Sequence, residues 1–277
     1  MSIPVLFDFI IYGFLIIAAV LILFLLVNLK GRGFSLPGFI LLIFAGLAWA
    51  TIFYGSFIEP LSVVVNQKTI NLTKNPKVSI RAAVISDFHV GPYKKTDFVE
   101  KVVARTLELK PHIILLGGDF VFSSADEVKY LEPLKNLKAP LGVFAVLGNH
   151  DYNELNPPIP LDAQNDKTRA IAIADALKSF GIKVLVNKTE FITKNGRTIY
   201  LIGIDDIWTN RAEIPYQVAP HPSVLLSHNP DIVAKAADIG IDLVVAGHTH
   251  GGQIRLPFIG PVPTIPDELG RDFTHGL

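Results

Sequence analysis

The chain has 277 residues, with 25 basic and 25 acidic side chains and no cysteine. Balanced charge without a basic block excludes the usual electrostatic signature of a nucleic-acid-binding protein. The lack of cysteine excludes disulfides and thiolate metal sites. The mean hydropathy of +0.42 is high for a purely soluble protein.

Two long uncharged stretches at the N-terminus explain this hydropathy. Residues 9–29 and 34–58 contain no charged side chain, and about 20 apolar helical residues cross a hydrocarbon core of ~30 Å. A cleaved signal peptide fits the first stretch poorly, because Asp8 precedes it and no basic residue does. We therefore predict a transmembrane hairpin over residues 1–58, with spans at about 9–29 and 36–58.

The charges that flank the spans favour one orientation in the membrane. Lys30 and Arg32 lie in the link between the spans, and short basic loops tend to stay in the cytoplasm. This places the remainder of the chain outside the cytoplasm. The basic residues that follow the second span, Lys68, Lys74 and Lys77, weaken that bias. The expectation is a multi-pass membrane protein with an extracytoplasmic domain.

Beyond a polar leader over residues 59–77, the pattern is that of one α/β domain over residues 78–277. An edge strand is expected in the leader at 62–65. Apolar runs predict strands at 78–86, 113–116, 143–147, 183–186, 189–193, 197–204, 223–226 and 241–245. Helical periodicity predicts helices at 96–109, 125–137, 168–180 and 230–238, the first with Thr96 as N-cap. This mixture indicates layers of helices and sheets with parallel and antiparallel strands.

Residue types that can bind metals or take part in acid–base chemistry follow five of these strands. They are Asp87 and His89 in ISDFHVG, Asp119 in LLGGDF, Asn149, His150 and Asp151 in VLGNHDY, His228 in LLSHNPD, and His248 and His250 in AGHTHGGQ. Sites in open α/β sheets are usually built at such strand ends, so we expect these side chains to meet. The remaining histidines, His112, His221 and His275, are interpreted as structural.

The last of these motifs places two histidines two residues apart. If the extended backbone continues from the strand into it, His248 and His250 point to the same side. On its own, the pair predicts either a shared metal site or two ordinary loop residues. Carboxylates and imidazoles without thiolates suit Mn, Fe, Zn or similar ions. Seven such ligands are enough for two ions if one carboxylate bridges them, and two ions ~3.5–4 Å apart form a clamp for phosphoryl transfer.

The ordered set D-x-H, GGD, GNHD, SH and GHTH resembles the calcineurin-like metallophosphoesterase superfamily over roughly residues 78–260. The strings LSHNPD, GIDDIW and AGHTHGGQIRLP are similar to its membrane-associated YkuE/YaeI-like branch, which the chlamydial-type UDP-2,3-diacylglucosamine pyrophosphatase also resembles. The resemblance implies a four-layer α/β/β/α sandwich. Little chain follows the last motif, so we expect a small second sheet or a truncated C-terminus.

The resemblance also implies a role for each motif residue. One divalent ion would be held by Asp87, His89 and His250, the second by Asn149, His228 and His248, with Asp119 as the bridge. His150 would contact the phosphate and protonate the leaving group. Asp151 would orient the His150 imidazole, as a carboxylate commonly does for a catalytic histidine.

The implied activity is hydrolysis of a phosphodiester or pyrophosphate bond by a hydroxide held between two metal ions. A lipid-linked substrate such as UDP-2,3-diacylglucosamine or a phospholipid fits the membrane hairpin, and a soluble substrate fits equally well. The alternative is a non-catalytic, membrane-tethered binding module on the same fold, against which the intact motif set argues.

Two further segments lie beside the expected site. The loop over residues 152–166 directly follows the GNHD motif and is expected to shape the substrate rim, because loops after strand ends commonly do. Asp205, Asp206 and Trp208 in GIDDIW also end a strand. They either face the site or cap the second sheet, and they are not expected as ligands.

Overall fold

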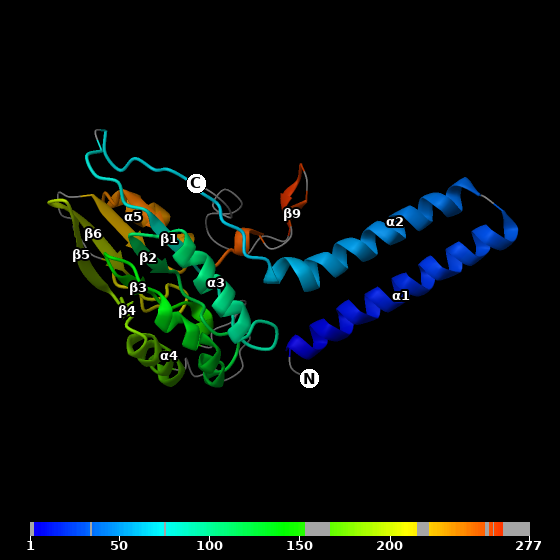
Figure 1. Cartoon of the computed structure of the whole chain (residues 1–277), viewed down its shortest axis with the longest axis horizontal. Helices are drawn as coiled ribbons and strands as arrows, with labels where there is room; N and C mark the ends of the chain where they lie inside the picture. Colours follow the sequence, from blue (N-terminus) through cyan, green and yellow to red (C-terminus); the bar gives the residue numbers. More distant parts are fainter. Residues whose placement is uncertain are drawn as a thin grey trace. The chain divides into compact units, whose positions relative to one another are not determined.

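The computed structural model divides the chain into two compact units, Met1–Asn66 and Gln67–Leu277. It describes residues 3–33, 35–74, 76–152, 167–214, 222–252, 255–256 and 258–262. Figure 1 shows the helices and strands of both units coloured along the sequence, with labels on α1–α5, β1–β6 and β9.

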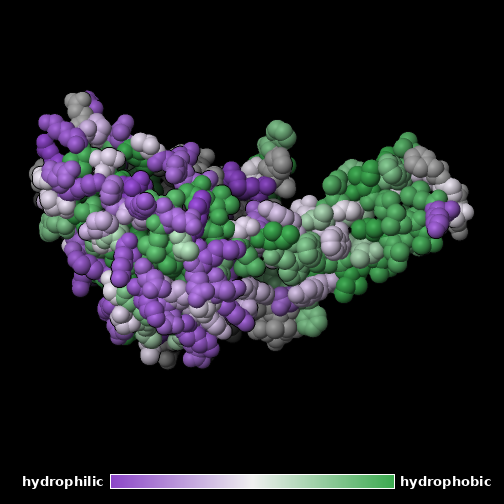
Figure 2. Space-filling model, in the orientation of Figure 1, coloured by the Kyte–Doolittle hydropathy of each residue, from purple (hydrophilic) through white to green (hydrophobic). Residues whose placement is uncertain are grey.

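The first unit consists of two long apolar helices. Helix α1 spans Ile3–Arg32, and α2 spans Leu36–Phe53 and continues as short turns to Leu61. The indole N–H of Trp49 donates to the carbonyl of Leu15 at 3.1 Å and ties the two helices together. By length and composition, both helices could cross a membrane. A signal sequence at the position of α1 would meet the same criteria. Figure 2 shows that the face of these helices in view is mostly hydrophobic.

The leader between the helices and the first strand has no described strand. The edge strand expected at 62–65 is wrong: these residues have no neighbouring strand to pair with, and Val64 is 74% exposed. The expected strand at 78–86 is likewise shorter, because ladder pairing begins only at Ala82.

The first sheet contains four parallel strands in the order β1-β2-β3-β4. Its strands are β1 (Ala82–Ile85), β2 (Ile113–Leu116), β3 (Val143–Ala145) and β4 (Lys183–Val184). The connecting helices are α3 (Thr96–Glu108), η3 (Ala125–Asn136) and α4 (Lys167–Ser179). The short β4 therefore belongs with the parallel strands rather than with the hairpin that follows it.

Two of the connecting helices differ from expectation in local geometry. Residue Lys95, without a side-chain bond, occupies the N-cap of α3, so Thr96 is the first helical residue and not the cap. The segment η3 is a 3₁₀ helix, and it contains Pro133, which has no N–H for the α-helical ladder. Ser124 and Glu127 form a capping box at its start.

The second sheet has the order β5-β6-β7-β8. Strands β5 (Lys188–Lys194) and β6 (Arg197–Gly203) form an antiparallel hairpin, while β7 (Ser223–Leu226) and β8 (Leu243–Val245) continue the sheet in parallel. The hairpin turn at Asn195 and Gly196 has positive φ at both residues, as the expected two-residue turn requires. The helical segments η5 (Pro230–Ile232) and α5 (Val233–Asp238) precede β8.

The two sheets pack face to face through one apolar cluster. The first sheet contributes side chains such as Leu115 and Phe144, and the second contributes Leu201 and Leu226. On the outer face of the second sheet, a separate cluster joins its strands to η5 and α5. Parallel strands buried on both faces read as continuous apolar runs, which explains why the sequence located them well.

Leu185 fills the space between the sheets, and its removal tests this packing. Leu185 is 2% exposed in the inter-sheet cluster, so Leu185→Ala is expected to lower the free energy of unfolding by about 2–5 kcal/mol. The neighbouring Val186→Ala is the matched control, with an expected effect below about 0.5 kcal/mol at its exposed position. Thermal unfolding of the ion-free full-length variants, followed by near-ultraviolet circular dichroism, measures both. Equal losses of stability in the two variants would contradict the assignment of Leu185 to the packing between the sheets.

Candidate metal centre

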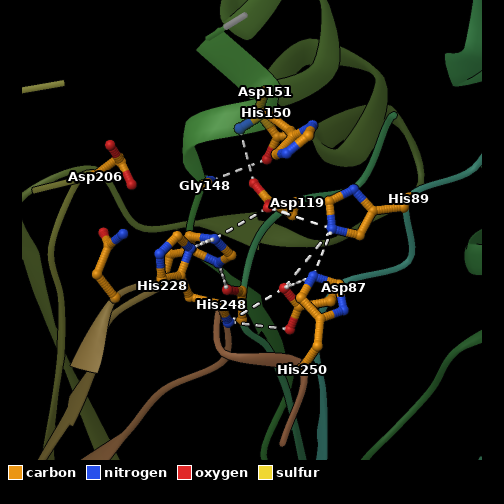
Figure 3. A network of polar contacts seen from close by, with 12 residues as sticks. Asp87, His89, Asp119, Gly148, His150, Asp151, Asp206, His228, His248 and His250 are labelled. Carbon is orange, nitrogen blue, oxygen red and sulfur yellow. Dashed lines mark hydrogen bonds and ion pairs between the residues drawn. The ribbon is translucent and has the colours of Figure 1, made fainter. Parts of the chain in front are cut away.

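The metal-binding residue types that follow β1, β2, β3, β7 and β8 converge on one region of the domain (Figure 3). Three groups of side chains offer ligand atoms within 4.8 Å of one another: Asp87, His89 and His250; His89, Asp119 and His150; and Asp119, His228 and His248. The structure thus brings together residues that are far apart in the sequence. The shared members His89 and Asp119 make the three groups one continuous site.

The backbone at this site adopts unusual dihedral angles. Asp87, His89, Asp119, His248 and His250 all have φ between 43° and 69°, a region that non-glycine residues seldom occupy. They are five of the ten non-glycine residues with positive φ in the described part of the chain. Such conformations cluster at functional sites because the surrounding structure must hold them in place.

This backbone corrects the expectation for the HTH motif. Strand β8 ends at Val245, and the positive φ values of His248 and His250 show that the chain is not extended there. The alternation argument therefore does not apply to the pair. The turn sends the two imidazoles into different groups, His250 with Asp87 and His248 with Asp119.

The first group is formed by Asp87, His89 and His250. The Nε2 atoms of the two histidines lie 3.1 Å apart, and each faces Oδ1 of Asp87, at 3.9 Å from His89 and 3.6 Å from His250. The Asp87 carboxylate also accepts the backbone N–H of His248 at 3.1 Å. This last bond fixes the carboxylate against the turn that carries both histidines.

The second group is formed by Asp119, His228 and His248. His228 Nε2 lies 3.1 Å from Asp119 Oδ2 and 3.2 Å from His248 Nδ1. His228 Nδ1 donates to the carbonyl of Gly117 at 2.7 Å, which directs Nε2 into the site. A carbonyl partner on the second ring nitrogen is the usual way in which a metal-binding histidine is oriented.

Asp119 lies between the two groups and is almost fully buried. Its Oδ2 atom, which faces His228, is also 3.4 Å from His89 Nε2. Its Oδ1 atom accepts the backbone N–H of His150 at 2.9 Å. One carboxylate oxygen therefore faces both candidate ligand sets.

The glycines beside Asp119 allow the strand ends to approach closely. Gly118 has a φ of 92°, and a Cβ there would lie 2.8 Å from Gly148 N and 2.9 Å from His228 Nδ1. A larger residue would therefore push apart the loops that carry Asp119 and His228.

The charges in the site depend strongly on one another. Burial lowers the pKa of His228, but the Asp119 charge and hydrogen bond outweigh it and raise the pKa of His228 to about 10. In turn, His228 and its hydrogen bond hold the pKa of Asp119 well below its usual range despite burial. Burial and the adjacent His228 lower the pKa of His248 to about 3. The buried carboxylate thus requires a positive partner, which a divalent cation supplies more strongly than an imidazolium.

The donor atoms fit divalent metal ions. Two nitrogens 3.1–3.2 Å apart, each about 2.0–2.1 Å from an ion, would subtend an angle of roughly 95–105° at that ion. Such an angle lies between octahedral and tetrahedral coordination. Imidazole nitrogen with carboxylate oxygen is the donor set of Mn, Fe and Zn sites.

His150 lies in the turn η4 (Asn149–Tyr152), beside the ligand groups. Its Nδ1 donates to the carbonyl of Phe122 at 2.9 Å, and its ring packs edge-on against His89 with centroids 4.5 Å apart. The neighbouring Asn149 is buried. A histidine held by Nδ1 in this way presents Nε2 for proton transfer.

Asp151 does not orient His150 as expected. Its Oδ1 accepts the backbone N–H of Phe120 at 2.9 Å, and its Oδ2 accepts that of Gly148 at 3.0 Å. Both carboxylate oxygens thus join the loops after β2 and β3, while the Phe122 carbonyl orients the imidazole. Burial and the nearby Asp119 raise the pKa of Asp151 to about 7.

The segment GIDDIW contacts the site more directly than its sequence indicated. The Tyr152 hydroxyl donates to both carboxylate oxygens of Asp205, at 2.7 and 2.9 Å. The Trp208 ring packs edge-to-face on His248 with centroids 4.0 Å apart. Asp206 is fully buried, and its Oδ1 accepts the backbone N–H of Thr209 at 2.8 Å. The signal available in the sequence was that the GIDDIW segment lies at the end of a predicted strand, which is β6 in the structure.

Of the three histidines outside the motifs, the structure describes only His112. His112 accepts the backbone N–H of Arg81 at 2.8 Å beside the start of β2. His221 and His275, and residues 153–166 of the loop expected to form the substrate rim, lie outside the described residues.

Comparisons with known proteins agree with this geometry. The model of the calcineurin-like phosphoesterase family matches residues 80–252. The phosphodiesterase YaeI of Escherichia coli is 34% identical over 212 residues, covering 74% of this chain and 72% of that protein. The uncharacterized metallophosphoesterase YkuE of Bacillus subtilis is 26% identical over 235 residues, covering 81% and 77%.

A third relative is the UDP-2,3-diacylglucosamine pyrophosphatase LpxG of Chlamydia trachomatis, which is 28% identical over 264 residues and covers 80% of this chain and 79% of LpxG. The family match spans all five strand ends that carry the candidate ligands. On this evidence, the chain belongs to the calcineurin-like phosphoesterase family.

Proposed function

We propose that this protein is a membrane-anchored phosphohydrolase that uses two divalent metal ions to cleave a phosphodiester or pyrophosphate bond. The observation that carries the proposal is the position of Asp119. Its Oδ2 lies 3.4 Å from His89 Nε2 and 3.1 Å from His228 Nε2, so this carboxylate could be shared by ions held in the two groups.

The remaining ligands are assigned by group. One ion would be held by Asp87, His89 and His250, and the second by His228 and His248 together with Asn149, with Asp119 shared. Asn149 is included because it is buried in the turn beside Asp119 and matches the family motif. Mn, Fe and Zn suit this donor set. When bound, two such ions provide a nucleophile from water at neutral pH and neutralise charge on the phosphate oxygens.

His150 is proposed to donate a proton to the leaving-group oxygen. The Phe122 carbonyl accepts from Nδ1 at 2.9 Å and fixes the ring, so that Nε2 is the atom presented to a substrate. The Asp119 carboxylate, which accepts the backbone N–H of His150 at 2.9 Å, keeps the turn in register with the ligands. General acid catalysis of this kind typically contributes a rate factor of about 10²–10⁴.

The rest of the chain supports a proposal for the setting and for the substrate class. We infer that the two apolar helices anchor the domain to a membrane, with the domain on the extracytoplasmic side, and that helices flank both sheets as a four-layer sandwich. YaeI is a phosphodiesterase and LpxG a pyrophosphatase by name, which supports these two bond types. A lipid-linked substrate is favoured by the anchor. A binding module without catalysis is the competing function.

Removing Asp119 tests the shared-ligand assignment. Asp119→Ala takes away the oxygen that faces both histidine groups, so the full-length variant is expected to lose bound metal and at least about 10²-fold in hydrolysis of bis-p-nitrophenyl phosphate. Elemental analysis and the hydrolysis rate are measured together. Asp175→Ala, which removes an exposed carboxylate from α4, is the control and should match the wild type.

Two results would contradict the assignment. The first is wild-type turnover by Asp119→Ala. The second is less than one equivalent of metal in wild-type protein prepared with excess Mn, Fe or Zn, which would favour the binding module.

Substituting His150 separates proton donation from metal binding. Because His150 is proposed to protonate the leaving group, His150→Ala should lower turnover about 10²–10⁴-fold on esters with a poor, alkyl leaving group. The loss should be much smaller on p-nitrophenyl esters, whose leaving group needs little protonation. Metal content should not change. A loss of equal size on both ester types would rule out the acid role.

Tyr152→Phe tests whether the second sheet supports the catalytic turn. The substitution removes only the hydroxyl that donates to Asp205 and leaves a buried carboxylate with one partner fewer, which costs about 1–3 kcal/mol of stability. Turnover should fall on alkyl esters more than on p-nitrophenyl esters, since His150 lies in the same turn. Asp205→Asn, which keeps an acceptor oxygen, should be milder. If Tyr152→Phe affected alkyl esters and p-nitrophenyl esters equally, the bond to Asp205 would not be what positions the turn that carries His150.

A further inference from the structure

A small hairpin follows the last ligand turn and has no role in the proposed chemistry. Its strands β9 (Arg255–Leu256) and β10 (Gly260–Pro261) pair antiparallel, with Leu256 opposite Gly260. The hairpin begins three residues after the turn η6 (His250–Gly252), which contains the candidate ligand His250. Whatever the hairpin contacts is therefore held beside the metal centre.

The base of the hairpin is fixed to that turn. Pro261 is buried, and Gly252 approaches it so closely, at a φ of 85°, that a Cβ at Gly252 would overlap the proline ring. Arg255 Nη1 donates to the carbonyl of Gly251 at 3.2 Å. The hairpin and the His250 turn thus form one connected element.

The tip of the hairpin exposes large apolar side chains. Phe258 is 109% exposed and Ile259 59%, and Figure 2 shows hydrophobic atoms at the end of the projection labelled β9 in Figure 1. Phe258 also has a φ of 66°, a left-handed conformation that a bulky residue adopts only under strain. A strained turn that displays an aromatic ring to solvent gains nothing from burial within the domain. Exposed apolar clusters of this kind mark interaction sites.

We propose that the hairpin tip, Phe258 with Ile259, inserts into the headgroup region of the lipid bilayer. The inference rests on the proposed function, because the two apolar helices are what bring a bilayer within reach of the domain. Aromatic and aliphatic side chains partition into this interface. The exposed Arg255 at the hairpin base adds attraction to anionic headgroups.

This contact would narrow the class of substrate. With its tip in the bilayer, the hairpin holds the His250 turn close to the level of the lipid phosphates. The metal centre would then act on a phosphodiester or pyrophosphate in a lipid headgroup rather than on a molecule free in solution. The apolar helices alone would only tether the domain to the membrane. The tip adds a contact that keeps the domain at the membrane surface.

The chain contains no cysteine, so a fluorophore can be attached at one chosen position. Full-length Phe258→Cys is labelled with an NBD dye and reconstituted into vesicles of phosphatidylcholine and phosphatidylglycerol with or without doxyl-labelled lipid. Phe191→Cys is the matched control, because Phe191 is 63% exposed on β5. The proposal predicts strong quenching by doxyl lipid at position 258 and little at position 191.

Several results would overturn the inference. Absence of quenching at position 258, or equal quenching at both positions, would mean that the tip does not enter the bilayer specifically. A change at position 258 that follows protein concentration instead would assign the tip to a second copy of the chain. Flotation of the wild-type protein with the vesicles is measured separately. Its failure would remove the membrane anchor of the proposed function, a result distinct from failure of the tip.

A second variant links the contact to substrate access. Phe258→Ser combined with Ile259→Ser should lower hydrolysis of a vesicle lipid with a p-nitrophenyl phosphodiester headgroup by at least about tenfold, because transferring one large apolar side chain from water shifts partitioning by that order. Hydrolysis of soluble bis-p-nitrophenyl phosphate should not change, and Phe191→Ser should affect neither. Equal losses on both substrates, or no loss on the vesicle lipid, would contradict the proposal.

Discussion

The buried carboxylate of Asp119 is the charge on which the site depends. It is almost inaccessible to solvent, and its oxygens face His89, His228 and the backbone of the turn that carries His150. Burying an ionised carboxylate is costly unless it is paired. The imidazoles gathered around it are therefore a requirement of the fold as well as of the chemistry. Divalent ions bound at the candidate groups would satisfy the same charge requirement.

The architecture meets this requirement at the carboxyl ends of strands from both sheets. The packed faces between the sheets fix β2 and β3 against β7, so that the residues just beyond each strand cannot separate. Left-handed backbone at Asp87, Asp119 and His248 then turns the side chains toward a common centre. Asp151 joins two of these loops through backbone hydrogen bonds. These bonds give Asp151 a structural position, because they hold together the loops that carry Asp119 and His150.

Support for the site extends outward in two directions. The bond from Tyr152 to Asp205 and the contact of Trp208 with His248 connect the ligand turns to the second sheet. On the other side, the β9–β10 hairpin connects the His250 turn to an exposed apolar tip. The same ligand turns are thus tied both to the core of the domain and to the surface that we propose meets the lipid.

The sequence by itself determined the family, located the strands of the two four-stranded sheets, and pointed to the aspartates and histidines that the structure brings together as candidate metal ligands. Apolar runs mark buried strands directly, and the ordered set of motifs after them is specific to one family. It did not determine the contacts of Asp151 or the conformation of the HTH motif, because local alternation fails where packing imposes positive φ. It also left the pairing of β4 and the role of Asp205 open. These depend on atoms brought together from distant parts of the chain, and only the tertiary structure decides which of them meet.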